Sequence, residues 1–233
     1  MKTLRSFVSK SALLVFLLSL FVLPGRAADG FTPLFNGRNL DGWTAIGGDT
    51  SSYYVENGLL ICRGDGRKFI FSEKQYANFI LRFDVKLDAG GNNGIGLRAP
   101  MNRHTHVEGM EIQIIDDPYY VRGIPKPNKK PADWTKFESY QRYGSIYGVV
   151  PARTGHLKPA GEWNQEEIVC NGRQVKVTLN GTIIVDANLD QVKPIDGLAH
   201  PGLSKSSGHL VLCAHGDYGA KVYFRNLQIK ELP

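Results

Sequence analysis

A short run of polar residues at 109–118 offers the chemistry that is easiest to place in this chain. Glu111 and Gln113 alternate there with apolar residues. Alternation of this kind predicts a strand whose apolar side chains enter a core, while the carboxylate and the amide share the opposite face. A half-exposed strand with a solvated outer face is the alternative interpretation of the same pattern.

Two further carboxylates follow this strand, those of Asp116 and Asp117, before Pro118 ends the run. Acids gathered in this way suit proton transfer, contacts with sugar hydroxyls or binding of a hard cation. We therefore expect the strand and the residues after it to contribute to a functional site.

An arginine close to two glycines marks a second candidate strand. Gly94, Gly96 and Arg98 share one of its faces if alternation holds throughout. Missing side chains let a ligand approach the backbone, and a guanidinium presents fixed donors to hydroxyl, keto or carboxylate oxygens. We expect this guanidinium to line the same hollow as Glu111 and Gln113. A structural ion pair is the alternative.

Three ring side chains could complete such a site. His215 follows an apolar strand, a position at a sheet rim from which an imidazole can reach a pocket. Tyr147 can donate a hydrogen bond into a cleft, and Trp134 can stack on the apolar face of a sugar. Each of these side chains could instead be packed in the core or exposed to solvent without a role in a site. The six histidines form no HxxxH or HExxH spacing, which excludes a preassembled helical zinc motif.

The first residues have the features of an export signal. Lys2, Arg5 and Lys10 precede an apolar run at 12–23, after which small residues follow. The run is short for a membrane span, and no second one occurs. We expect a signal peptide over 1–28, one mature domain over 29–233 without a membrane span, and a periplasmic or extracellular location.

Loss of that signal would leave a nearly neutral protein. Four of the 28 basic residues lie before residue 29, where no acid occurs, so 24 remain against 22 acidic residues. This balance gives little support for nucleic-acid binding. The three cysteines allow at most one internal disulfide, and buried thiols are expected. The chain has no Gly-x-Ser-x-Gly elbow, phosphate loop or dinucleotide fingerprint.

Turn signals, rather than helical periodicity, organise the rest of the chain. The 26 glycines and 12 prolines divide it into short segments of alternating polarity. Residues 79–87 alternate in this way, and Asn-Gly pairs at 57–58, 171–172 and 180–181 predict tight hairpins. So many strands pack most naturally as a two-sheet sandwich. Residues 119–143 lack any period and predict a long loop of the kind that carries function.

Seven blocks of residues then occur in a recognisable order. They are LFNG at 34–37 with LDGW at 40–43, NGI at 93–95 with Arg98, the segment 109–117, IYG at 146–148, GEWN at 161–164, LNG at 179–181 and FRNL at 224–227. Their order resembles the 3-keto-disaccharide hydrolase family, long known only as a domain of unknown function, over essentially the whole mature chain. The resemblance implies an all-β, concanavalin A-like jelly roll of two antiparallel sheets, often secreted by bacteria that degrade glycans.

The activity that the resemblance implies is cleavage of glycosidic bonds in sugars oxidised at C3, by hydrolysis or by elimination across C1 and C2. A 3-keto group acidifies the C2 proton, so a base can form an enolate that expels the C1 substituent if a cation or hydrogen-bond donors stabilise the oxyanion. The strand faces would make Glu111 the first choice as base or metal ligand, His215 the alternative base, Arg98 and Gln113 the groups that orient sugar oxygens or stabilise charge, and Asp116 or Asp117 a cation or hydroxyl ligand.

The sequence thus predicts an exported enzyme that acts on a carbohydrate, a 3-keto-glycoside. No cofactor is certain, and a divalent cation stays an open alternative. Two rival functions are a conventional glycoside hydrolase with two carboxylates and a carbohydrate-binding module without catalysis, since sandwiches of this type also carry lectins. The absence of a Glu-x-Asp-x-x-Glu strand counts against the first rival.

Overall fold

The structure is a computed structural model. It describes residues 30–102, 104–124, 130, 135–216 and 219–233. The expected signal segment and Trp134 lie outside these ranges, so the fold and the site are drawn from the rest of the chain.

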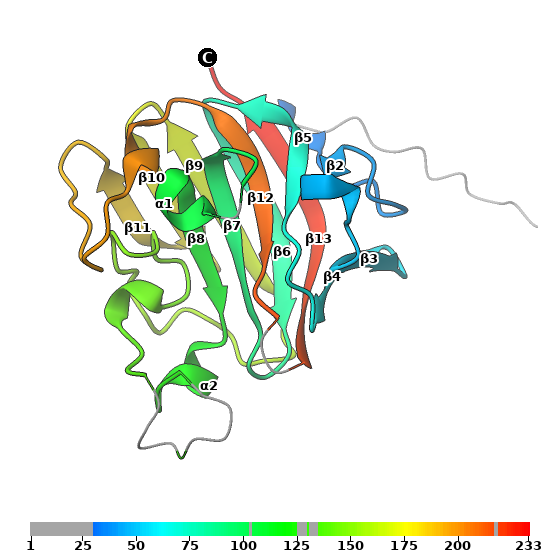
Figure 1. Cartoon of the computed structure of the whole chain (residues 1–233), viewed down its shortest axis with the longest axis horizontal. Helices are drawn as coiled ribbons and strands as arrows, with labels where there is room; N and C mark the ends of the chain where they lie inside the picture. The colour runs from blue at the N-terminus through cyan, green and yellow to red at the C-terminus, as the bar shows by residue number, and fades with distance from the viewer. Residues whose placement is uncertain (1–29, 103, 125–129, 131–134, 217–218) are drawn as a thin grey trace, which may run out of the picture.

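Two antiparallel sheets form the protein (Figure 1). The larger, eight-stranded sheet has the order β11-β10-β9-β6-β13-β4-β3, with β1 paired to β13. Its strands are β1 (Thr32–Pro33), β3 (Tyr53–Glu56), β4 (Leu59–Gly64), β6 (Phe79–Leu87), β9 (Asn164–Asn171), β10 (Gln174–Leu179), β11 (Thr182–Asn188) and β13 (Gly219–Glu231). The predicted all-β class is confirmed.

The five-stranded sheet has the order β2-β5-β12-β7-β8. Its strands are β2 (Trp43–Thr44), β5 (Ile70–Tyr76), β12 (Gly208–Ala214), β7 (Asn92–Ala99) and β8 (Met110–Ile115). The helical elements are short: α1 (Thr105–Glu108), α2 (Asp117–Tyr120) and the 3-10 turns η2 (Ile46–Gly48), η4 (Ser139–Gln141) and η5 (Pro201–Ser204). No helix in the described ranges combines the length and the apolar character needed to cross a membrane.

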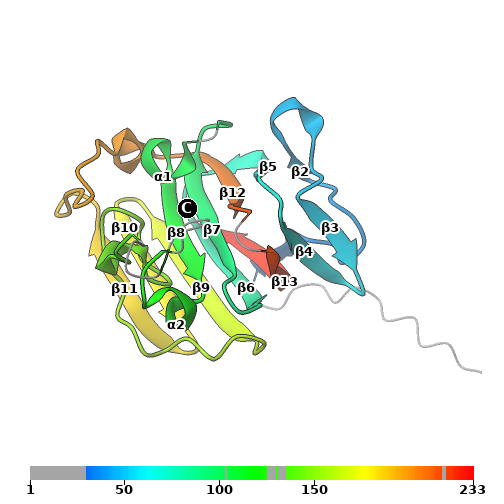
Figure 2. The ribbon, with the colours of Figure 1, turned by 60° about the horizontal axis from the view of Figure 1, so that its bottom comes forward.

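The hydrophobic core lies between the two sheets, which stack as layers (Figure 2). Leu81 and Phe224 enter it from the large sheet, and Leu97, Ile112 and Leu212 enter it from the small one. Burial of apolar side chains on alternate positions is what selects a two-sheet sandwich from these strands. All three cysteines, Cys62, Cys170 and Cys213, are buried free thiols.

Two of the three predicted Asn-Gly turns are present, and the third turn is shifted by one residue, because Asn171 ends β9 and pairs with Gln174. Asn57 and Asn180 adopt positive φ values of 50° and 49°, and each is followed by a glycine that is also in the left-handed region. Asparagine tolerates this conformation better than most residues, so these pairs fix the registers of β3 with β4 and of β10 with β11.

The outer edge of β8 is covered by the chain that follows it. The amide of Tyr147 donates to the Glu111 carbonyl at 2.9 Å, and the amide of Gly144 donates to the Gln113 carbonyl at 2.7 Å. On its other side β8 pairs with β7, and α1 lies against both strands (Figure 1). These hydrogen bonds satisfy backbone groups that the edge strand would otherwise leave unpaired. Together with α1, the segment also covers part of the outer face of the small sheet.

Candidate active site

The strand β8 places its polar residues as alternation predicts. Ile112 is in the inter-sheet core, whereas the side chains of Glu111 and Gln113 project from the other face. That face is not solvated: Glu111 is 3% exposed and Gln113 is 4% exposed. The alternative of a half-exposed strand is wrong, because α1 and residues 142–150 cover this surface. Burial of a carboxylate costs free energy unless the group has hydrogen-bond or ionic partners, so the partners of Glu111 have to be identified.

Gly94 of β7 makes room for the Glu111 carboxylate. A Cβ atom added at Gly94 would collide with Glu111 Oε1 and crowd its Cδ and Cγ atoms. At Gly96 an added Cβ would meet Thr105 and Val211 in the same way. The glycines therefore do leave space over the sheet, as predicted, but the protein's own side chains fill it.

His215 is the direct partner of this carboxylate. Its Nε2 lies 3.0 Å from Glu111 Oε1, and its side chain is 29% exposed. The ring of Phe69 meets the imidazole edge-on, with centroids 5.7 Å apart. The sequence placed His215 at the rim of β12, and the structure confirms that it reaches the same site as Glu111. A carboxylate joined to an imidazole is a common arrangement for moving a proton.

These two residues line a cavity of about 200 Å³ on the outer face of the small sheet. The other polar residues of its lining are Asn92, His106, Gln113, Gln141 and Tyr147, and the apolar ones are Ile115, Tyr120, Ile124 and Phe137. The lining thus combines an apolar wall with polar groups that converge, as binding sites for small polar ligands do.

Gln113 lines this cavity, although its acceptor oxygen is not accessible to solvent. Its Nε2 donates to Asn92 Oδ1 at 3.2 Å, while its Oε1 is buried and accepts no hydrogen bond from any residue that the structure describes. Buried acceptors of this kind are costly and usually mark a place for a ligand or a water.

Tyr147 brings a phenol to the same space. Gln141 Nε2 donates to its Oη at 3.0 Å, and burial raises the pKa of the Tyr147 hydroxyl above its ordinary value. The phenol therefore stays protonated at neutral pH and can donate its hydrogen toward the cavity. The predicted direction of Tyr147, into a cleft, agrees with its place in the lining.

His106 was missed as a site residue by sequence reasoning. It belongs to α1, and its ring stands edge-on to that of Tyr147 with centroids 5.7 Å apart. Burial lowers the pKa of His106, while the Glu111 carboxylate acts in the opposite sense. The only signal in the sequence was the pair of histidines at 104 and 106 just before the acidic strand, and nothing there showed that this connection folds back over the sheet.

A buried pair supports the backbone of His106. His200 Nδ1 lies 3.1 Å from the His106 carbonyl oxygen, and its Nε2 lies 3.0 Å from Asp196 Oδ2. The side chains of this pair are only 1% and 5% exposed. The loop before β12 is thus hydrogen-bonded to α1, and this contact fixes the position of α1 over the cavity.

Arg98 does not reach the cavity, and the expectation that its guanidinium lines the same hollow as Glu111 is wrong. It is 1% exposed, and it donates to the carbonyls of Ala77 at 2.9 Å, Gly172 at 2.8 Å and Lys205 at 3.3 Å. The physical reason is a bulge: the register of β7 with β12 shifts here, and Arg98 adopts a φ of 50°. A bulge breaks alternation and redirects the side chain.

Asp116 and Asp117 do not line the cavity, and their carboxylates instead accept hydrogen bonds from the backbone. Asp116 Oδ2 accepts from the amide of Gly90 at 2.9 Å, and Asp117 Oδ1 accepts from the amide of Tyr143 at 2.9 Å. Burial raises the pKa of Asp117 to about 6. Because strand β8 ends before them, neither side chain continues its outer face, and the structure does not bring them to the site.

The sequence suggested Glu111, with Asp116 or Asp117, as cation ligands, and the described residues offer a different candidate set around Glu111. Ligand atoms of Glu111, Cys213 and His215 all lie within 4.8 Å of one another. Oxygen, sulfur and nitrogen together suit a borderline ion such as zinc better than calcium or magnesium. Burial raises the pKa of the Cys213 thiol well above its ordinary value, so without an ion the thiol stays protonated.

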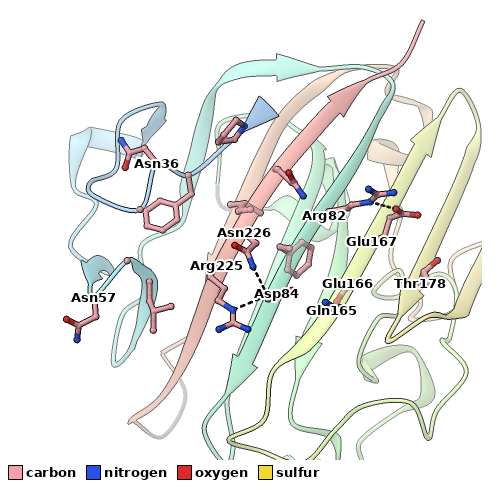
Figure 3. Close-up of a pocket in the computed structure, with 18 of the residues that line it drawn as sticks. Asn36, Asn57, Arg82, Asp84, Gln165, Glu166, Glu167, Thr178, Arg225 and Asn226 are labelled. Atoms are coloured by element: carbon pink, nitrogen blue, oxygen red, sulfur yellow. Dashed lines mark hydrogen bonds and ion pairs between the residues drawn. The ribbon is translucent and has the colours of Figure 1, made fainter. Parts of the chain in front are cut away.

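A cavity of about 910 Å³ lies on the outer face of the large sheet (Figure 3), and Glu111 is not among the residues that line it. Arg225 and Asn226 both donate to Asp84 Oδ2, at 3.0 and 2.8 Å, and Arg82 pairs with Glu167 at 2.6 Å. Glu166 also lines this cavity, but it is 3% exposed and its Oε2 accepts from Tyr143, which is not among the lining residues. Size alone does not make this cavity the site, because its other charged side chains are paired with one another.

Comparisons with known proteins point to one family. The family model described as "3-keto-alpha-glucoside-1,2-lyase-like domain" matches residues 30–230. A protein of Bacteroides thetaiotaomicron named 3-keto-disaccharide hydrolase is 26% identical in an alignment that covers 88% of this chain and 79% of that protein. These matches agree with the resemblance found in the motif order.

Solved structures agree. A crystal structure from Parabacteroides distasonis, described as "putative glycosyl hydrolase", has a TM-score of 0.71 and 28% identity, covering 88% of this chain and 94% of that one. A family GH16 endo-β-1,3(4)-glucanase has a TM-score of 0.50 and 11% identity over 88% of this chain and 93% of that one, a likeness of fold alone. The concanavalin-like sandwich expected from the motifs is confirmed.

Proposed function

The chain belongs to the 3-keto-alpha-glucoside-1,2-lyase-like domain family, and we propose that it cleaves the glycosidic bond of 3-keto-glycosides, including 3-keto-disaccharides, at the cavity that contains Glu111 and His215. The observation that supports this proposal most directly is the 3.0 Å contact between Glu111 Oε1 and His215 Nε2. Both residues line a cavity of about 200 Å³ together with other polar side chains. A relative named for hydrolysis of 3-keto-disaccharides supports the same substrate class.

In this proposal Glu111 removes the C2 proton of the bound 3-keto sugar. The electrons of that C–H bond form the C1–C2 double bond by way of an enolate, and the C1–O bond breaks with its electron pair going to the leaving oxygen. His215 gives a proton to that oxygen. Transfer of the proton held by Glu111 to His215, across the 3.0 Å contact, restores both groups.

The groups around the pair would stabilise the enolate oxygen and orient the ring. Tyr147 donates from a phenol whose pKa is raised by burial, and Gln113 lies in the wall of the same cavity. Donors positioned in advance are effective because they need no reorganisation as charge develops. Addition of water to the eliminated sugar would convert the overall reaction into hydrolysis.

A divalent cation is the alternative means of stabilising that charge. Glu111, His215 and Cys213 are the residues that would hold it. A bound cation would supply positive charge close to the developing oxyanion. Metal analysis of the purified protein after addition of Zn²⁺, beside a His215→Gln variant, tests this: stoichiometric zinc in the wild type alone would favour the cation.

We also propose that the protein acts outside the cytoplasm. The support is the basic and then apolar character of the first 23 residues, with small residues after them. Expression of the full chain in a bacterial host, followed by N-terminal sequencing of the protein recovered from periplasm and medium, checks this. Retention of residue 1 on all of the protein would contradict it.

The test of the proposed reaction compares sugars that differ only at C3. Wild type should release the leaving group from a 3-keto-glucoside and leave the matching glucoside intact, since only the ketone acidifies C2. Turnover of both would favour a conventional two-carboxylate hydrolase, and binding of oligosaccharides with turnover of neither would favour a binding module.

A further inference from the structure

A second cavity adjoins the proposed catalytic pair. It measures about 250 Å³, and its lining includes Ile46, Arg67, Phe69 and His215. His215 therefore lines both this cavity and the one that contains Glu111. We call the new one the His215 annex.

Both cavities open on the same face of the small sheet. Phe71, Val211 and Cys213 form an apolar cluster separate from the inter-sheet core, and Phe69 packs against it. Val211 and Cys213 alternate on β12 with side chains that enter the core, so this cluster lies on the outer face, the face of Glu111. The annex and the Glu111 cavity are thus neighbours along one surface, with the imidazole between them.

The charge of the annex is positive. Lys68 pairs with Asp49 at 3.5 Å, which leaves the Arg67 guanidinium as the cation without a carboxylate partner in the lining. In the described ranges, the hydrogen bond given for Arg67 is a 3.5 Å contact to the Gly216 carbonyl oxygen. Ile46 adds an apolar wall that is 43% exposed.

We infer that the annex is the leaving-group subsite and that it favours a single ring bearing an anionic substituent. The inference rests on the proposed function, because the group that protonates the leaving oxygen must stand between the sugar that reacts and the group that departs. His215 has that position. Phe69 and Ile46 then contact the face of the departing ring, and Arg67 receives its carboxylate.

The shared chemistry, a ring with a carboxylate, has two sources: a uronic acid and an aromatic acid. Four 3-keto-glucosides separate them, with glucuronic acid, glucose, para-hydroxybenzoate and phenol as leaving groups. We expect wild type to show a kcat/KM about fivefold higher for each acid than for its neutral counterpart, a modest factor because Arg67 is exposed. A preference within the aryl pair alone, or within the sugar pair alone, identifies the source.

The variant Arg67→Gln should abolish this preference, so that each acid and its neutral counterpart have the same kcat/KM. Arg38→Gln, which removes an exposed arginine outside both cavities, is the matched control and should retain it. Added salt should weaken the preference in wild type, since exposed charges are screened. Equal kcat/KM for acids and neutral partners in wild type, or an unchanged preference in Arg67→Gln, overturns the subsite while leaving the proposed function standing.

Failure of the proposed function has a different signature, which is that wild type cleaves none of the four substrates. Calorimetric titration with para-hydroxybenzoate then decides about the annex by itself. Weaker binding to Arg67→Gln than to wild type and Arg38→Gln supports an anion-binding cavity, and identical binding to all three rejects it.

Discussion

His215 Nε2 lies 3.0 Å from Glu111 Oε1 although the two residues are 104 positions apart, and β8, which contains Glu111, is not a neighbour of β12, which His215 follows. β7 runs between β12 and β8, and the contact crosses it where Gly94 has no side chain. A glycine on the intervening strand is therefore a structural requirement for this pair.

Replacement of the carboxylate should remove most activity. Glu111→Gln keeps the size of the side chain but cannot accept the C2 proton, so we expect kcat on a 3-keto-glucoside to fall by about 10²–10⁴-fold. Release of the leaving group is measured beside Glu167→Gln, a carboxylate of the opposite sheet that pairs with Arg82 at 2.6 Å. Equal rates for wild type and Glu111→Gln would reject the role given to Glu111.

The glycine between the pair provides an independent prediction. Gly94→Ala should push the Glu111 carboxylate away from His215, because the new Cβ would occupy its position. We expect kcat to fall at least about tenfold, as misplacement of a catalytic group by about 1 Å costs this much or more. Gly96→Ala crowds Thr105 and Val211 instead, so it should lower the melting temperature with a smaller effect on kcat. Full activity of Gly94→Ala would mean that the pair is not needed in this geometry.

Arg98 should prove structural. Arg98→Gln would leave the carbonyls of Ala77, Gly172 and Lys205 with fewer donors, and we expect a loss of roughly 3 kcal/mol in the free energy of unfolding. Urea unfolding measures this, and KM at a temperature where the variant is folded should match that of wild type. A higher KM with unchanged stability would instead restore the substrate-binding role expected from the sequence.

Glu166 should make stability depend on pH. This residue of β9 is 3% exposed, Tyr143 Oη donates to its Oε2 at 2.6 Å, and burial raises its pKa from 4.5 to about 8. Between these values the folded protein binds a proton that the unfolded chain does not. The contribution of Glu166 is therefore fully present below about pH 4.5 and is lost as the pH rises toward 8, by on the order of 1 kcal/mol per pH unit.

The variant Glu166→Gln checks this sign. Its free energy of unfolding, measured in urea from pH 5 to pH 8, should fall less steeply with pH than that of wild type, because its amide does not titrate. The neighbouring Glu167→Gln removes an exposed carboxylate of the same strand and should follow the wild-type slope. Parallel curves for wild type and Glu166→Gln would show that the buried carboxyl does not titrate in this range.

The sequence by itself determined the elements and the directions of side chains within regular strands. Alternation placed Glu111 and Gln113 on one face of β8, and asparagine-glycine pairs fixed the hairpins, because both effects depend on residues close together in the chain. The position of His215 at the end of a strand was enough to suggest it as a site residue.

Only the tertiary structure decided which of these residues meet. Arg98 does not lie on the predicted face, because the bulge at this position depends on the register with a partner strand. Asp116 and Asp117 accept hydrogen bonds from backbone amides of other segments. His106 joined the site because α1 folds over β7 and β8. Such contacts arise from long-range packing and from the burial of polar groups that must find partners, which local patterns in a sequence do not contain.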